Sequence, residues 1–189
     1  MLRKLYCPLV VLAILCGPVL AADNYTIDPD HSLLRFTVSH FLFLTTPGSF
    51  NRISGKVWLD RAAQTGSVDA TVDTRSINTA HGERDDNLRS PNFFNAQKYP
   101  AASYLSSTIK FDGDVPGSVE GTLTLLGVTK PVTLTITSVQ CDIRPADNKE
   151  GCTAAASALI KRSDFGMTYA IPLVGDPIKL MFELQAVKD

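Results

Sequence analysis

Hydrophobic and polar residues alternate with a period of two through most of the chain beyond residue 22. Successive side chains of a β-strand point to opposite faces, so this alternation predicts strands with one apolar and one polar face. The pattern is clear in HSLLRFTVSH, where one face carries Leu34, Phe36, Val38 and His40. It recurs in four further stretches, at residues 68–73, 122–125, 132–137 and 178–184. This part of the chain is therefore expected to be all-β.

Turn signals separate these stretches and indicate an antiparallel sheet. Pro-Gly, Asp-Gly and Gly-Asp-Pro combinations stand at residues 47–48, 112–113, 116–117 and 175–177. Strands with one apolar face and short turns fold either into a sandwich or into a closed barrel, and the alternation alone does not choose between them. The sequence has no repeat and no long linker, so we expect a single domain over residues 22–189.

One stretch, RDDNLRSPNFFNAQKYP at residues 84–100, breaks the alternation. Thr79 is a candidate helix N-cap ahead of it, and Ser90 followed by Pro91 repeats the signal for a helix start. We expect two short helical turns over an open end of the sheet. In one interpretation these turns form a lid, with three apolar side chains pointing inward and three charged ones around them: Leu88, Phe93 and Phe94 inside, and Arg84, Asp85 and Arg89 outside.

Simpler roles stay open for the lid residues. Phe93 and Phe94 can plug the end of the sheet as ordinary core. The two arginines of this stretch can form surface salt bridges with Asp85 or Asp86.

Two residues outside the lid are also candidates. His40 shares its face with apolar residues, so we expect it in the interior, either as a satisfied core histidine or as a hydrogen-bond partner of a ligand. In KRSDFG, Arg162 and Asp164 are expected to form a structural ion pair that fixes a turn at Phe165.

The first 21 residues have the features of a secretory signal peptide. Basic residues Arg3 and Lys4 precede an apolar run, and small residues precede a cleavage site after Ala21, with Ala22 as the alternative. The apolar run is shorter than the roughly 20 residues of a membrane-spanning helix. We therefore expect a periplasmic or secreted protein that has no stable membrane span after cleavage.

Charge and motifs exclude several classes of function. Cleavage of the leader removes Arg3 and Lys4 and takes the formal net charge from −1 to −3, so no nucleic-acid partner is expected. Neither Gly-x-Ser-x-Gly nor His-Glu-x-x-His occurs, and we assign no catalytic residue. An enzyme that acts on a lipid inside the sheet structure stays open as an alternative, as does a packed protein without any ligand.

The cysteines predict one disulfide. The leader contains two of the four, which leaves Cys141 and Cys152 on either side of the polar segment DIRPADNKEG. In an oxidising compartment this arrangement predicts a bridge that closes a hairpin loop. No Cys-x-x-Cys pair or neighbouring histidine is present, so we expect no metal site.

Four blocks of the sequence, in this order, resemble the YceI-like, polyisoprenoid-binding family: HSLLRFTVSH, RDDNLRSPNFFNAQKYPAASY, GTLTLLGVTKPVTL and IKRSDFGMTYAIPLVGDPIKL. The resemblance implies a lipocalin-like antiparallel β-barrel of about eight strands with a short helical cover. It also implies a bound isoprenoid or other long-chain lipid, such as a polyprenyl phosphate or an isoprenoid quinone. No other cofactor is expected, and a homodimer stays open.

The ligand-binding candidates follow from combining the strand faces with this resemblance. Strand residues are expected to line a tunnel, Phe93 and Phe94 to cover it, and Arg84 and Arg89 to lie near a polar head group. The complete set is Leu34, Phe36, Val38, His40, Phe41, Phe50, Arg84, Leu88, Arg89, Phe93, Phe94, Leu123, Leu125, Leu134 and Phe165.

Overall fold

The structure is a computed structural model that describes residues 22–41 and 44–189. Its strands are β1 (Asp23–Ile27), β2 (Leu33–His40), β3 (Leu44–Phe50), β4 (Ile53–Asp60), β5 (Thr65–Asp73), β6 (Ile77–Asn78), β7 (Ala101–Asp112), β8 (Val115–Leu125), β9 (Val128–Ile143), β10 (Glu150–Lys161) and β11 (Val174–Lys188). The helical elements are α1 (Gly82–Arg89) and two short 3-10 turns, η1 (Thr74–Ser76) and η2 (Arg162–Phe165). The predicted signal peptide lies outside the described residues.

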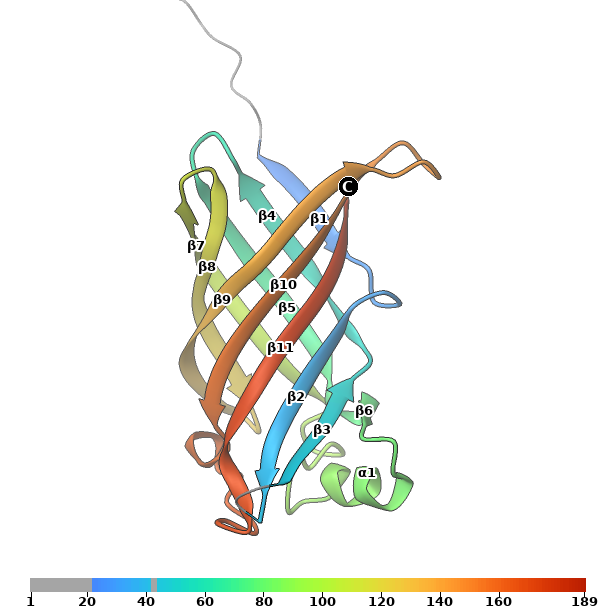
Figure 1. The fold of residues 1–189 in the computed structure, drawn as a ribbon, viewed down its shortest axis with the longest axis vertical. Helices are drawn as coiled ribbons and strands as arrows, with labels where there is room; N and C mark the ends of the chain where they lie inside the picture. Colours follow the sequence, from blue (N-terminus) through green and yellow to red (C-terminus); the bar gives the residue numbers. More distant parts are fainter. Residues whose placement is uncertain (1–21, 42–43) are drawn as a thin grey trace, which may run out of the picture.

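Eight strands close into an antiparallel barrel (Figure 1). Around the ring the order is β1, β4, β5, β7, β8, β9, β10 and β11, and pairing of β11 with β1 completes it. The predicted barrel of about eight strands with a helical cover is confirmed. The alternative of a sandwich is excluded, because a sandwich leaves edge strands that this closure removes.

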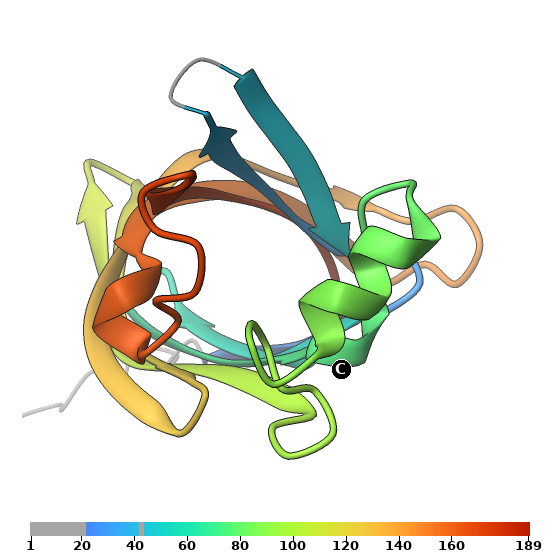
Figure 2. The same cartoon turned by 90° about the horizontal axis from the view of Figure 1, so that it is seen from below.

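A second set of pairings builds one end of the molecule. The last residues of β11 pair with β1, whereas residues 174–183 pair with β2, and β2 continues the sheet through β3 to the short β6. Figure 2 looks at this end, where the β2–β3 hairpin, α1 and the connection from β10 to β11 surround the opening of the ring. We refer to it as the lid end.

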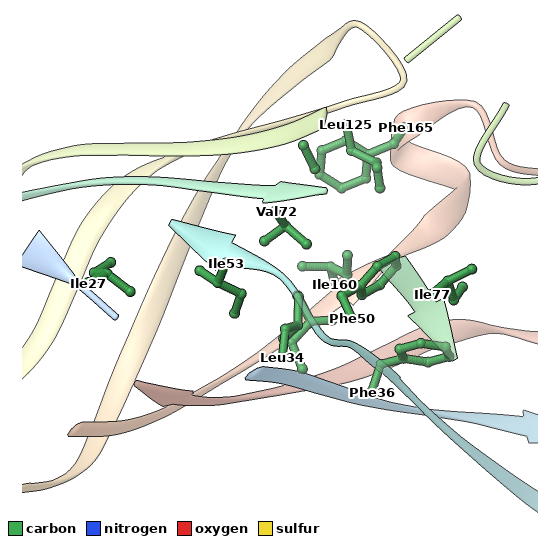
Figure 3. Close-up of a cluster of buried hydrophobic side chains, with 12 residues drawn as sticks. Ile27, Leu34, Phe36, Phe50, Ile53, Val72, Ile77, Leu125, Ile160 and Phe165 are labelled. Carbon is green, nitrogen blue, oxygen red and sulfur yellow. The ribbon is translucent and has the colours of Figure 1, made fainter. Parts of the chain in front are cut away.

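The apolar faces that the alternation predicted point into the barrel. Leu34 and Phe36 of β2 and Leu180 of β11 are buried and belong to one cluster with Phe50, Val72 and Ile160 (Figure 3). A second cluster, around Tyr104 and Leu134, fills the barrel further from the lid end. The core is thus made of the side chains on the inward face of the strands.

The helical cover differs from the prediction in two details. His81, and not Thr79, caps α1, because its Nδ1 accepts the backbone N–H of Arg84 at 3.3 Å. The Thr79 hydroxyl instead donates to Asp85 at 2.6 Å. Ser90 ends α1 as its C-cap, and the residues after it form turns, so the second predicted helical turn is wrong.

The disulfide between Cys141 and Cys152 is present and confirms the prediction from cysteine spacing. The two residues face each other directly across β9 and β10, with Cα atoms 4.1 Å apart. They lie near the end of β9 and the start of β10, and the hairpin between these strands is at the end of the barrel opposite the lid end (Figure 1). Within residues 22–41 and 44–189, no helix is both long enough and apolar enough to cross a membrane.

Candidate functional site

A cavity of about 130 Å³ lies inside the barrel. Most of its wall is built by residues of β2, β5, β7, β8 and β11. Single side chains come from β3, β4, β9, β10 and η2, and three come from the lid segment, which we define as residues 84–100. Nearly all of the wall is aliphatic or aromatic. The small side chains of Ala70 and Ala102 lie among larger neighbours and leave part of this space open.

Ten of the fifteen predicted site residues line this cavity. They are Leu34, Phe36, Val38, Phe50, Leu88, Phe93, Phe94, Leu123, Leu125 and Leu134. They come from four strands and from the lid segment, so the structure brings together residues that are up to about a hundred positions apart. The alternation located the strand residues because it depends only on each strand and not on its neighbours.

The lid segment turns its apolar side chains toward the cavity. Phe94 contacts Phe50 of β3 edge to face, with ring centroids 5.1 Å apart. Phe93 is 7% exposed and contacts Tyr169 in the same manner at 5.4 Å. The two rings therefore cover the cavity and are packed on the protein at the same time.

Arg84 and Arg89 do not line the cavity. Arg84 is exposed, and its guanidinium donates to the Thr79 hydroxyl and the Thr79 carbonyl, both at 2.7 Å. Arg89 donates to the carbonyls of Arg75 and Ile77, each at 3.0 Å, and to Asp86 at 2.9 Å. Both side chains tie α1 to the preceding backbone, and for Arg89 the surface salt bridge with Asp86 is present.

The three remaining predicted residues also lie outside the cavity wall. His40 ends β2 and contacts Phe41 edge to face at 4.3 Å, and Phe41 is 48% exposed. His40 is only partly buried, beyond the apolar interior where the alternation placed it. Phe165 is 2% exposed and packs in the core cluster from η2.

Arg162 is a cavity-lining residue that we did not predict, and its predicted ion pair with Asp164 is wrong. Arg162 is 2% exposed and donates to three backbone carbonyls: Gly175 at 2.9 Å, Met167 at 3.0 Å and Val174 at 2.9 Å. Asp164 is exposed. Burial lowers the pKa of Arg162, while the charge of Asp176 acts in the opposite direction.

Asp176, and not Asp164, is the carboxylate that is hydrogen-bonded to η2. It accepts the Ser163 backbone N–H at 2.9 Å and the Ser163 hydroxyl at 2.8 Å, and these bonds help to lower its pKa. Together with Arg162, it fixes η2 against the start of β11. The local sequence gave no sign of these partners, because they lie 13 residues away in the chain.

Tyr104 is another wall residue outside the predicted set. Its hydroxyl lies 2.9 Å from the carbonyl oxygens of both Val119 and Val132, and burial raises its pKa to about 12. The alternation of Ala102 and Tyr104 along β7 could have identified its face. Tyr104 and Arg162 thus use their donors on backbone carbonyls. Thr74 of the same wall does likewise, because its hydroxyl donates to the carbonyl of Tyr99 at 2.7 Å. Ser103 is the remaining polar residue of the wall, which is otherwise apolar.

Comparison with known proteins identifies relatives of similar length. The YceI-like domain family matches residues 25–186. A UPF0312 protein of Pectobacterium atrosepticum is 33% identical over 193 residues, which cover 100% of this chain and 99% of that protein. Protein YceI of Escherichia coli is 33% identical over 175 residues, covering 91% of this chain and 90% of the relative.

Solved structures with the same fold include BcnA of Burkholderia cenocepacia, with a TM-score of 0.67 and 26% identity. That match covers 84% of this chain and 98% of BcnA. A polyisoprenoid binding domain from Saccharophagus degradans has a TM-score of 0.64 at 19% identity, covers 87% of this chain and 98% of the domain, and shows the fold alone.

Proposed function

This chain belongs to the YceI-like family, and from that premise we propose that it binds a long apolar isoprenoid chain inside its barrel. The observation that carries the proposal is the cavity, whose wall is almost entirely aliphatic or aromatic and whose cover is the aromatic pair Phe93 and Phe94. A wall of this kind recognises a hydrocarbon tail by burial. We therefore propose a binding protein for lipid carriage or storage.

The energetics agree with such a ligand. Burial of a CH₂ group contributes about 0.8 kcal/mol, so an isoprene unit contributes about 4 kcal/mol. Association costs about 4–15 kcal/mol, so about three to six units leave micromolar affinity. A tail of that length is sufficient without any polar contact.

The cavity volume adds a condition. An apolar cavity of about 150 Å³ accepts benzene, so the 130 Å³ here correspond to about one isoprene unit. A longer tail requires wall side chains to turn away from the barrel axis or the lid segment to move. Because its cover consists of side chains and turns and not of a paired strand, the lid end is the end that can open.

Two finer points belong to the same proposal. The wall selects for the tail and not for the head, so a polyprenyl phosphate and an isoprenoid quinone both fit, with the head at the lid end. The name of the Saccharophagus degradans domain states that it binds polyisoprenoids, which supports this ligand class. The signal peptide predicted at residues 1–21 supports export to the periplasm or the outside of the cell.

Organic extraction of the purified protein, followed by mass spectrometry, tests the proposal. The wild type is expected to yield an isoprenoid lipid, and Leu125→Trp, which fills part of the cavity, to yield about tenfold less. The matched control is Leu105→Trp, because Leu105 lies on the outer surface of β7 at 60% exposure. Equal lipid content in both variants, or no lipid in a wild type purified from its own host, would contradict the proposal.

A further inference from the structure

Half of the ten large apolar side chains that are exposed in the described residues gather at the lid end. We name this group the apolar rim, and it comprises Phe41, Leu44, Tyr169, Ile171 and Leu173, which are 38–58% exposed. It comes from two places, the β2–β3 hairpin and the connection between η2 and β11 (Figure 2). Patches of this kind mark contacts with another protein or with a membrane.

The two parts of the rim are joined to each other and to the cavity cover. The backbone N–H of Phe41 donates to the carbonyl of Leu173 at 2.8 Å. Tyr169 rests edge to face on Phe93, whose ring lines the cavity. The rim is therefore continuous with the entrance of the site that the preceding subsection proposes for a lipid.

The backbone at the rim is held in an unfavourable conformation. Phe41 has φ = 50° and Ala170 has φ = 60°. Positions in this left-handed region favour glycine or asparagine, and a bulky residue there is strained. Here a large ring occupies such a position while 48% exposed, and it packs edge to face on His40 at 4.3 Å. An apolar surface outside the protein would cover the exposed part of this ring.

The charge and the size of the apolar rim indicate which kind of partner it contacts. Residues 44–50 and 166–175 contain no Asp, Glu, Lys or Arg. A stable protein interface needs about 20–30 residues on each side, whereas these two loops contain 17 residues in total. An uncharged group of aliphatic side chains with an aromatic ring suits the interface of a bilayer, where tyrosine and tryptophan gather.

We propose that the apolar rim docks on the surface of a lipid bilayer and presents the entrance of the barrel to it. The apolar chain then passes between membrane and barrel without crossing water. The identity of the transferred lipid rests on the proposed function. The docking itself does not, because binding of the protein to a membrane can be measured directly. The absence of charged residues from the two loops makes the docking hydrophobic and independent of anionic lipids.

Flotation with phosphatidylcholine vesicles tests the proposal. The wild type is expected to float with the vesicles, and Leu44→Asn/Leu173→Asn to bind them more weakly by about tenfold or more. The control variant is Leu105→Asn/Val115→Asn, which changes two side chains of similar exposure, 60% and 55%, away from the rim. Its binding is expected to equal the wild type's. Raising NaCl from about 0.1 M to about 1 M should not weaken binding, because no charge pair is involved.

A fluorescent probe locates the contact. Trp58 is the single tryptophan and lies on β4, so Phe41→Trp in a Trp58→Phe background reports on the rim alone. Its emission is expected to shift to shorter wavelength with vesicles and to be quenched by brominated lipids. Leu105→Trp in the same background should show neither effect.

Three results would overturn the docking proposal. The first is a wild type that does not float with the vesicles. The second is an equal loss of vesicle binding in the control variant. The third is a wild-type dimer that the rim substitutions dissociate, because the apolar rim would then contact a second copy of the protein and not a membrane. Lipid content after extraction separates this inference from the function itself. A rim variant that keeps a preloaded isoprenoid but no longer floats has lost docking alone, whereas a wild type that floats but carries no lipid retains docking and contradicts the function.

Discussion

Phe94 contacts Phe50 edge to face, with ring centroids 5.1 Å apart, and this contact joins the lid segment to the barrel wall. Both residues line the cavity, so Phe94 contributes to stability and to closure at once. We expect Phe94→Ala to lower the free energy of unfolding by about 2–3 kcal/mol, because the side chain is half-buried. The same variant should release a bound isoprenoid faster, because the tail would then meet water.

Phe111→Ala is the matched control for this variant. Phe111 is also half-buried but packs in the second cluster and does not line the cavity. It should lose similar stability in urea unfolding and leave the lipid off-rate unchanged. If Phe94→Ala loses stability with an unchanged off-rate, the lid segment serves packing alone.

The three carbonyl contacts of Arg162 lead to a second prediction. A guanidinium can donate to Gly175, Met167 and Val174 at the same time, whereas the single ammonium group of lysine cannot reach all three positions. Arg162→Lys is therefore expected to lower the free energy of unfolding by about 3 kcal/mol, since it leaves buried acceptors unpaired.

Arg35→Lys provides the comparison, because Arg35 forms an exposed pair with Glu183. Its effect should stay below about 0.5 kcal/mol. Chemical unfolding of both variants gives the two values. Equal and small losses would mean that η2 and the start of β11 hold their positions without Arg162.

The strand faces could be predicted because their period is a property of each strand alone. Leu34, Phe36 and Leu125 were located in this way, without knowledge of the neighbouring strands. Closure of the barrel depends on pairing between β1 and β11, at opposite ends of the chain, and only the resemblance to a family indicated it.

The hydrogen-bond partners of the arginines could not be predicted from the local sequence. Arg84 and Arg89 were expected near a lipid head group. In the structure both donate to carbonyls whose positions are set by the path of the backbone through residues 75–79. Arg162 was paired with the nearest carboxylate in sequence, whereas its acceptors lie 5 to 13 residues onward in the chain.

Tyr104 gives a prediction for alkaline solution. Burial raises its pKa in the folded protein to about 12, and the charge of Glu120 acts in the same direction. The pKa in the unfolded chain is about 10. The neutral phenol therefore contributes stability that is present below pH 10 and is lost as the pH rises through 12.

Tyr104→Phe should remove this part of the pH dependence. At neutral pH it should also lower the free energy of unfolding by about 1 kcal/mol, because the bonds to Val119 and Val132 are lost. Urea unfolding between pH 7 and pH 11 measures both effects. Tyr169→Phe, at a ring that is 52% exposed, should keep the wild-type slope. A wild-type slope in Tyr104→Phe would mean that other groups control alkaline unfolding.

The disulfide is expected to stabilise the barrel without affecting the cavity. Cys141 and Cys152 are 11 positions apart in sequence. A bridge that closes a loop of this size stabilises by about 2–3 kcal/mol, chiefly through the unfolded chain. The β9–β10 hairpin that carries the bridge lies at the end of the barrel opposite the lid segment (Figure 1), and the guanidinium of Arg61 donates to Glu150 of the same hairpin at 2.9 Å. Cys141→Ser/Cys152→Ser should therefore unfold more easily and keep its extracted lipid.

Unfolding in the presence of a reductant is the control for the double serine variant. Dithiothreitol should bring the wild type to the stability of the double serine variant and leave that variant unchanged. Mass measurement should show the wild type two hydrogens heavier after reduction. Because the β9 and β10 residues around the bridge are already paired in the sheet, the reduced barrel should stay folded at room temperature. Loss of lipid together with the bridge would show that the end of the barrel opposite the lid controls access to the cavity as well.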